Sequence, residues 1–147
     1  MGRLIGLMIL GLLAVAAPAM ASPSVAHTTY EAIGLEGHPP LEVGRVLDVT
    51  HGVNRGAMER HVVAGARAET TYSVIGHVFS TPDCALGSIA VPEGVIRTGP
   101  SGSGSLTVLF PGEALAGAPN RFWVRWELEA GTEVAYRSGC VEVTLDD

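Results

Sequence analysis

Three histidines and one methionine are the residues of this sequence best suited to holding a metal ion: His51, Met58, His61 and His77. Imidazole and thioether groups suit copper, particularly in an oxidising compartment. His51 and His61 flank a glycine-rich turn at 52–56, and His77 lies in the next segment of alternating residues. Their spacing matches no established metal motif, so packing of Met58 and surface positions for the histidines remain the alternative. Copper binding is therefore the second hypothesis.

A variant of the copper hypothesis uses His27. If the chain were cut after the small residues Ser24-Val25-Ala26, the new terminal amine and the His27 imidazole would together chelate copper. That cut lies farther beyond the apolar leader than signal peptidases usually act.

The segment Arg121-Phe-Trp-Val-Arg-Trp-Glu127 is the favoured candidate binding surface. Alternation on a strand places Arg121, Trp123 and Arg125 on one face, opposite an apolar set that includes Trp126. A tryptophan between two arginines suits stacking on a sugar ring or contact with an acidic protein. The alternative is that a loop covers Trp123 and that local carboxylates pair with the arginines.

Motifs that would indicate an enzyme are missing from the sequence. It contains no Gly-x-Ser-x-Gly, His-Glu-x-x-His, Ser-x-x-Lys or phosphate-loop pattern, and it has no lysine. Ser101 and Ser103 lie in a Gly/Ser-rich loop that is too soft to hold a nucleophile in place. We therefore expect a non-catalytic protein that needs no cofactor.

The charge of the chain limits its partners. The formal net charge is −6, and all nine basic residues are arginines. A groove for nucleic acid would need clustered basic residues, so nucleic acid is not an expected partner. An unidentified protein or glycan is the partner that we expect, and the sequence does not indicate an oligomeric state.

The first 21 residues have the pattern of a cleaved signal peptide. Arg3 precedes an apolar run at 4–17, and Ala19-Met20-Ala21 has the small-x-small form of a cleavage site. The run is shorter than the roughly 20 residues that span a bilayer, so we expect no membrane span after cleavage. The prediction is a secreted or periplasmic domain over residues 22–147, which begins at Ser22.

Two cysteines, Cys84 and Cys140, fall in the predicted mature chain. An even pair in an exported protein most simply forms one disulfide, and no Cys-x-x-Cys motif indicates redox chemistry. We therefore predict a structural disulfide between them.

Short alternating segments bounded by Gly, Pro, Asn and Asp predict a chain made almost entirely of strands. We expect nine strands at 30–35, 43–50, 60–63, 71–79, 88–91, 95–98, 105–110, 121–128 and 133–145, with a helical turn near 112–116. The apolar face changes within the last strand, and a bulge at Gly139 would explain that change. Nine short strands predict a single-domain all-β fold of two packed sheets.

This strand pattern resembles the architecture of immunoglobulin-like β-sandwiches. Trp123 and Trp126 lie between the two cysteines, although on a late strand, and Tyr136 stands four residues before Cys140 rather than two. The resemblance covers architecture only and transfers no functional residue. The sequence as a whole predicts a secreted or periplasmic binding or structural module of unknown ligand.

Overall fold

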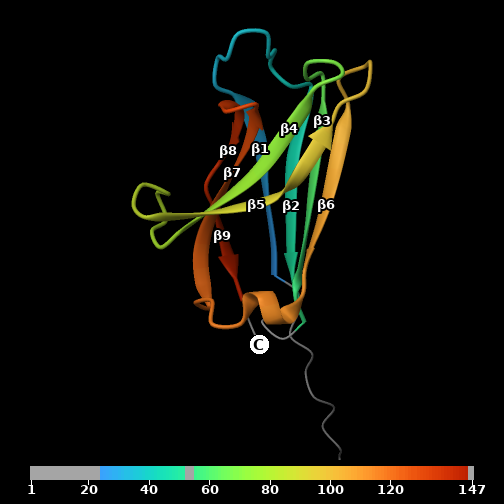
Figure 1. Cartoon of the computed structure of the whole chain (residues 1–147). Coiled ribbons are helices and arrows are strands. Elements are labelled where there is room, and N and C mark those ends of the chain that lie inside the picture. The colour runs from blue at the N-terminus through green and yellow to red at the C-terminus, as the bar shows by residue number, and fades with distance from the viewer. Residues whose placement is uncertain (1–23, 52–54, 146–147) are drawn as a thin grey trace, which may run out of the picture.

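The structure is a computed structural model that describes residues 24–51 and 55–145. The predicted leader at 1–21 and the predicted mature start at Ser22 lie outside the described residues. Within the described part, strands dominate and the fold is all-β, as predicted (Figure 1). Its one short helix in those ranges is the 3-10 turn η1 (Gly112–Leu115), and no helix there is long and apolar enough to cross a membrane.

The strands follow the expected order closely. They are β1 (Ser24–Ala32), β2 (Val43–Thr50), β3 (Ala57–Ala64), β4 (Thr71–Phe79), β5 (Ser88–Arg97), β6 (Gly104–Phe110), β7 (Arg121–Ala130), β8 (Glu133–Ser138) and β9 (Val141–Thr144). Two predicted short strands are joined in β5, and the predicted last strand is divided into β8 and β9.

All nine strands belong to one hydrogen-bonded path rather than to two separate sheets. The order is β5-β4-β7-β8-β1-β2-β3-β6, with β9 paired to β7. β1 joins the two halves, because its first residues pair with β2 and its last three residues pair with β8. The path curls so that β5 and β6 approach each other (Figure 1). The body is therefore barrel-like rather than clearly the two-sheet sandwich that alternation predicted.

β5 and β6 meet at only one end of this barrel. There Leu106 lies against Gly94, and Gly104 lies against Ile96 and the backbone of Arg97. At their other ends the two strands diverge, and η1 lies near the opening (Figure 1). No strand pairing joins β5 to β6, both of which are fully described. This seam leaves the interior open on one side.

Apolar side chains from both halves of the path fill most of the interior. The alternation of each strand sends every second side chain inward, which accounts for the period-two burial of β3 and β4. The largest fully buried side chains are Trp126, Tyr72, Tyr136, Ile96, Leu128 and Leu145.

The predicted disulfide is present and joins Cys84 to Cys140, with 6.0 Å between their Cα atoms. Cys84 lies in the loop after β4, and Cys140 lies at the break between β8 and β9. This break contains one residue more than the part of β7 opposite it, because Glu127 pairs with Arg137 and Val124 with Val141. The extra residue changes the apolar face at Gly139, as the expected bulge would. A Cβ atom at Gly139 would also lie only 2.8 Å from Thr28 Oγ1, so a larger residue there would displace the Thr28 side chain.

Candidate functional site

A group of ionisable side chains lies inside the barrel, among residues that are otherwise apolar. Asp48 on β2 is opposite Glu59 on β3, and His61 follows two residues after Glu59 on the same inward face. All three residues are buried, and His61 is completely inaccessible. Such groups are rarely buried without partners, because removing a charge from water is costly. These three residues therefore form a candidate site.

Glu93 reaches this group from β5 because the strand is bulged at that point. Val74 is paired with Gly94 and Ile75 with Pro92, so Glu93 is the extra residue between two paired positions. A bulge of this kind changes the direction of a side chain, and here it turns the Glu93 carboxylate inward, where the side chain is 3% exposed. Gly76 on β4 leaves the space that this carboxylate occupies.

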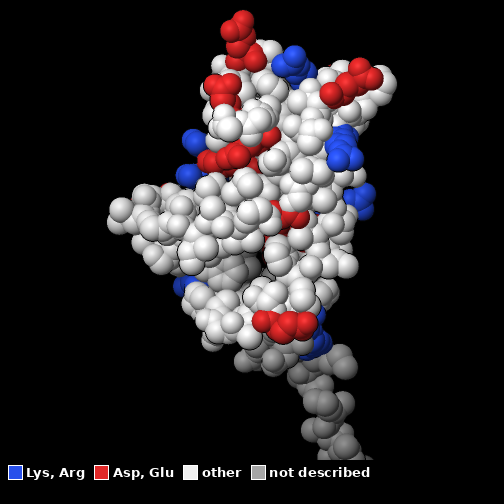
Figure 2. Space-filling model, in the orientation of Figure 1, with Lys and Arg blue, Asp and Glu red and all other residues white. Residues whose placement is uncertain are grey.

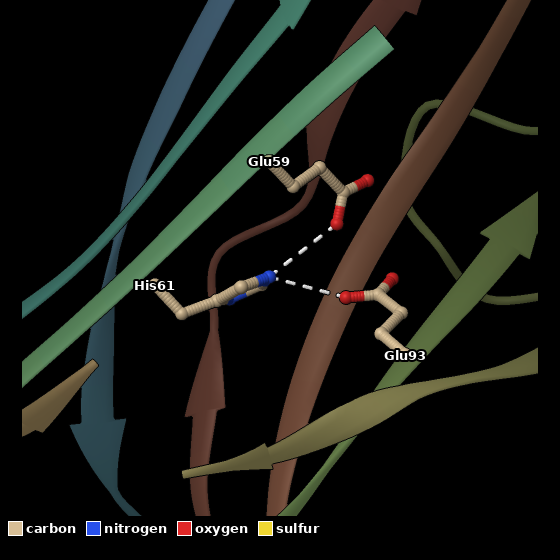
Figure 3. A group of neighbouring side chains, drawn as sticks. All are labelled: Glu59, His61 and Glu93. Carbon is tan, nitrogen blue, oxygen red and sulfur yellow. Dashed lines mark ion pairs between the residues drawn. The ribbon is translucent and has the colours of Figure 1, made fainter. Parts of the chain in front are cut away.

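His61 faces both Glu59 and Glu93 (Figure 3). Its Nε2 atom lies 3.4 Å from Glu59 Oε2 and 3.1 Å from Glu93 Oε2. Neither approach has hydrogen-bond geometry, so His61 Nε2 and Glu93 Oε2 are buried atoms without a hydrogen-bond partner. The three side chains come from β3 and β5, which are not neighbours in the sheet path. Curling of the sheet therefore creates the cluster.

Two aromatic side chains hold this cluster in position. Tyr30 Oη lies 2.9 Å from His61 Nδ1, within hydrogen-bond distance. Trp126 Nε1 donates to Glu59 Oε2 and to Glu93 Oε1, each at 3.0 Å. These contacts fix the orientation of the imidazole ring and of both carboxylates. We refer to Glu59, His61 and Glu93 as the carboxylate–histidine cluster.

Burial and mutual repulsion shift the pKa values of this region. Burial and then the charge of Glu59 raise the pKa of Asp48 well above the usual range of a carboxyl group, and burial likewise raises the pKa of Glu59. Burial alone would lower the pKa of His61, but Glu59 and Glu93 outweigh it and raise that pKa. Burial and these two carboxylates also raise the pKa of the Tyr30 hydroxyl. The cluster therefore favours protons or another positive charge.

A cavity of about 380 Å³ reaches the cluster. Asp48, Thr50, Glu59 and Glu93 provide its polar lining, and Figure 2 shows acidic atoms recessed in a hollow of the surface. The rest of the wall is apolar and includes Val78, Ile89, Val91, Phe110, Leu115 and Phe122. The cavity thus combines an apolar wall with an acidic floor, and η1 lies at its rim.

The residues of the predicted copper set lie in different places. His61 is inside the barrel, whereas Met58 alternates with it and lies on the outward side of β3. His51 is exposed after β2, and His77 lies on β4 with its Nε2 atom 3.1 Å from Glu127 Oε2. The structure therefore does not bring the four residues together. Only His61 belongs to the carboxylate–histidine cluster.

His27, the other predicted copper ligand, is exposed on β1 and opposite Leu47 of β2. Ser24, Val25 and Ala26 before it are also paired with β2. The strand therefore continues on the amino-terminal side of His27.

The predicted binding surface of Arg121, Trp123 and Arg125 lies on the outer face of β7. Trp123 is half-buried, and the exposed Arg121 pairs with Glu142 at 3.4 Å. Arg125 is half-buried: its guanidinium lies 5.1 Å from the centre of the Phe79 ring and 3.7 Å from Glu127 Oε1. Both arginines of this predicted binding surface thus have acidic partners within the chain.

The sequence interpretation missed Asp48, Glu59 and Glu93. Asp48 lies two residues after buried Val46, and Glu59 lies two residues before His61, so each carboxylate is in phase with an inward face. This alternation was the signal in the sequence from which inward-facing carboxylates could have been predicted. Glu93 carried no such signal, because Pro92 and Gly94 around it indicated a turn between two strands rather than a bulge within one.

Comparison of the chain with protein-family models, with curated proteins and with solved structures finds no match.

Proposed function

We propose that this protein is a non-catalytic binding protein that takes a small, largely apolar molecule into its barrel. The observation that carries the proposal is the cavity, which has an apolar wall and only a few polar groups at its inner end. Cavities of about 300–1,000 Å³ with such a lining are typical of small-molecule sites, and barrel interiors are common places for them. Binding would bury the ligand's apolar part against residues such as Val91 and Phe122.

The acidic floor determines which end of the ligand enters first. Asp48, Glu59 and Glu93 offer carboxyl oxygens to the cavity. A ligand with a hydrogen-bond donor or a positive charge at one end would satisfy these oxygens, whereas a carboxylate ligand would be repelled. The preferred ligand is therefore apolar over most of its length, with a neutral or basic polar end.

The cavity is a better candidate than the outer face of β7 for this function. Arg121 and Arg125 already have acidic partners there, so a glycan or an acidic protein would have to compete with them. At the cavity floor, Glu93 Oε2 is buried without a hydrogen-bond partner. Arg125 Nε also lacks one, but its guanidinium is already engaged by Phe79 and Glu127.

We further propose that the protein acts outside the cytoplasm, in the periplasm or as a secreted domain. The leader pattern at 1–21 supports this location. The Cys84–Cys140 disulfide is compatible with it, because such bonds persist in oxidising compartments.

Titration with N-phenyl-1-naphthylamine, a neutral apolar probe that fluoresces in dry sites, tests the proposed function. We expect one binding site with a Kd of about 1–100 µM, the range that burial of a ligand of this size supports. Ala118→Trp would fill the cavity beside η1 and should weaken binding at least tenfold. Ala116→Trp is the matched control, because Ala116 is exposed on the same turn but does not line the cavity.

Trp126 gives a second readout of where the probe binds. In a Trp123→Phe background, Trp126 is the remaining tryptophan and contacts two carboxylates of the floor. Probe in the cavity should change its fluorescence in proportion to occupancy. Absence of saturable binding, or equal loss in the Ala118 and Ala116 variants, would overturn the proposed function.

A further inference from the structure

We propose that Glu59, His61 and Glu93 bind a divalent transition-metal ion at the inner end of the cavity. One imidazole nitrogen and two carboxylate oxygens form a mixed donor set that suits Zn²⁺, Mn²⁺ or Fe²⁺. Thioether and thiolate groups, which would favour Cu⁺, are not part of the set. The proposed site shares only His61 with the copper set predicted from the sequence.

The positions of the donor atoms support an ion rather than direct hydrogen bonds. Each of the three residues offers a donor atom, and these atoms lie within 4.8 Å of one another. Donors placed about 2.0–2.2 Å from a common ion are separated by about 3.0–3.5 Å in octahedral or tetrahedral geometry. His61 Nε2 lies 3.4 Å from Glu59 Oε2 and 3.1 Å from Glu93 Oε2, which matches that spacing.

The orientation of the imidazole is the second observation. At these short distances the Nε2 atom of His61 is directed at neither carboxylate oxygen well enough to form a hydrogen bond. Figure 3 shows its ring edge directed toward the gap between Glu59 and Glu93. The His61 side chain is fully buried and the Glu93 side chain is 3% exposed, so bulk water does not supply the missing hydrogen bonds. An ion in the gap would give both atoms a partner.

The hydrogen-bonding contacts of Tyr30 and Trp126 with the cluster, its outer contacts, resemble those that generally support metal ligands. A ligating histidine usually donates its other ring N–H to an oxygen, and Tyr30 Oη lies 2.9 Å from His61 Nδ1. With that N–H on Nδ1, the Nε2 lone pair is free to bind a metal ion. Trp126 Nε1 steadies both carboxylates through its two contacts at 3.0 Å.

The site also leaves room for a fourth ligand. Glu59 and Glu93 line the cavity, whereas His61 lies behind them and does not. An ion held by all three would therefore face the cavity with open coordination positions, as ions with three protein ligands do. A cavity ligand with an oxygen or nitrogen at its polar end could complete the coordination. The metal site itself does not depend on the proposed function.

Titration of metal-free protein with Co²⁺ tests the proposal, because the visible absorption of Co²⁺ reports its ligands. We expect a 1:1 complex with an absorption change that Zn²⁺ reverses. Glu59→Gln and Glu93→Gln keep side-chain volume and an oxygen for Trp126, so both variants should fold. Each should weaken Co²⁺ binding by more than about 100-fold, which exceeds the 10–100-fold loss expected when a contact outside the ligand set is removed.

His77→Gln is the matched control. His77 is also 3.1 Å from a carboxylate, and its Nε2 atom also lacks a hydrogen-bond partner, but it lies outside the cluster. Its substitution should leave Co²⁺ binding unchanged. Tyr30→Phe should weaken binding about 10–100-fold while keeping the 1:1 ratio, as expected for an outer contact.

Absence of a stoichiometric Co²⁺ complex would overturn the metal site, and so would equal affinity in wild-type protein and the two Glu→Gln variants. Loss of binding in His77→Gln would place the ion elsewhere and would also overturn it. Naphthylamine binding to metal-free protein distinguishes the two proposals. If the probe binds and Co²⁺ does not, the cavity function stands and the metal site is overturned. If Co²⁺ binds and the probe does not, the metal site stands and the cavity function is overturned.

Discussion

Gly76 and Glu93 occupy complementary positions inside the barrel. A Cβ atom at position 76 would collide with Glu93 Oε1 and lie 3.5 Å from Trp126 Nε1. The glycine thus allows a carboxylate from β5 to cross in front of β4. The bulge in β5 and the missing side chain in β4 are both required to place Glu93 at the floor of the cavity.

Gly76→Ala should displace the Glu93 carboxylate rather than unfold the chain, because the collision involves the end of a side chain and not the backbone. We expect the free energy of unfolding to fall by about 1–3 kcal/mol, the usual range for overpacking. Urea denaturation would measure it. Adding Glu93→Ala should recover part of the loss, because that substitution removes the colliding group. Additive effects of the two substitutions would contradict this relationship.

Removing the disulfide should destabilise the protein without changing its fold. In Cys84→Ala/Cys140→Ala, a link between residues 56 positions apart is lost. Loss of a native disulfide from a small domain lowers the free energy of unfolding by about 2–5 kcal/mol. Denaturant unfolding of the double variant, with the reduced wild-type protein for comparison, would measure this loss. An unchanged midpoint with an unchanged slope would show that the bond contributes nothing.

Two arginine–glutamate pairs on the outer face should differ in energy because they differ in burial. Arg137 Nε donates to Glu127 Oε1 at 2.8 Å, and the Glu127 side chain is only 8% exposed. Arg137→Gln should cost about 1 kcal/mol, a value that allows for the half-exposed arginine. Arg121→Gln, which breaks the exposed pair with Glu142, should cost about 0–0.5 kcal/mol. Equal midpoints in thermal or urea unfolding would contradict this ordering.

His38 should make the fold less stable in mild acid. It is buried in the loop between β1 and β2, and its Nδ1 atom lies 2.8 Å from Tyr72 Oη. Burial and then Arg67 lower its pKa below 6.5, against a smaller opposing effect of Glu133, and Tyr136 also packs against the ring. A lowered histidine pKa means that the unfolded chain binds the proton more tightly. Stability from this group is therefore present above about pH 6.5 and decreases as the pH falls below it.

The difference between wild-type protein and His38→Gln isolates this contribution, because the other titrating groups are common to both. Unfolding at pH 7.5 and at pH 5.5 should show a larger loss of stability in wild-type protein than in the variant. Equal losses would show that His38 does not cause the acid sensitivity.

Most of the secondary structure could be predicted from the sequence, because alternation and turn residues are local signals. The strand at 71–79 and the disulfide were confirmed. The arrangement of the strands was not predictable in the same way. Whether nine strands form two sheets or one curled path depends on β1, whose two ends pair with different partners. No local pattern in residues 24–32 indicates that change of partner.

The cluster was predictable only in part. His61 was identified by its side-chain type, but its partners come from another strand and from a bulge. Glu59 and His61 share a face at i and i+2, so their association could be read from the strand alone. Glu93 could not, because long-range curling and the space at Gly76 bring it to His61.

The unpaired seam between β5 and β6 has a mechanical consequence. Where Gly94 meets Leu106, the edges of β5 and β6 are joined only by contacts of the Leu106 side chain. No backbone hydrogen bonds between these two strands must break when they separate. Widening this gap therefore costs side-chain contacts, including the approach of Glu93 on β5 to His61 on β3, while the ladders from β4 through β3 remain intact. The opening can therefore widen for proposed ligands of different size while the strand pairing is kept.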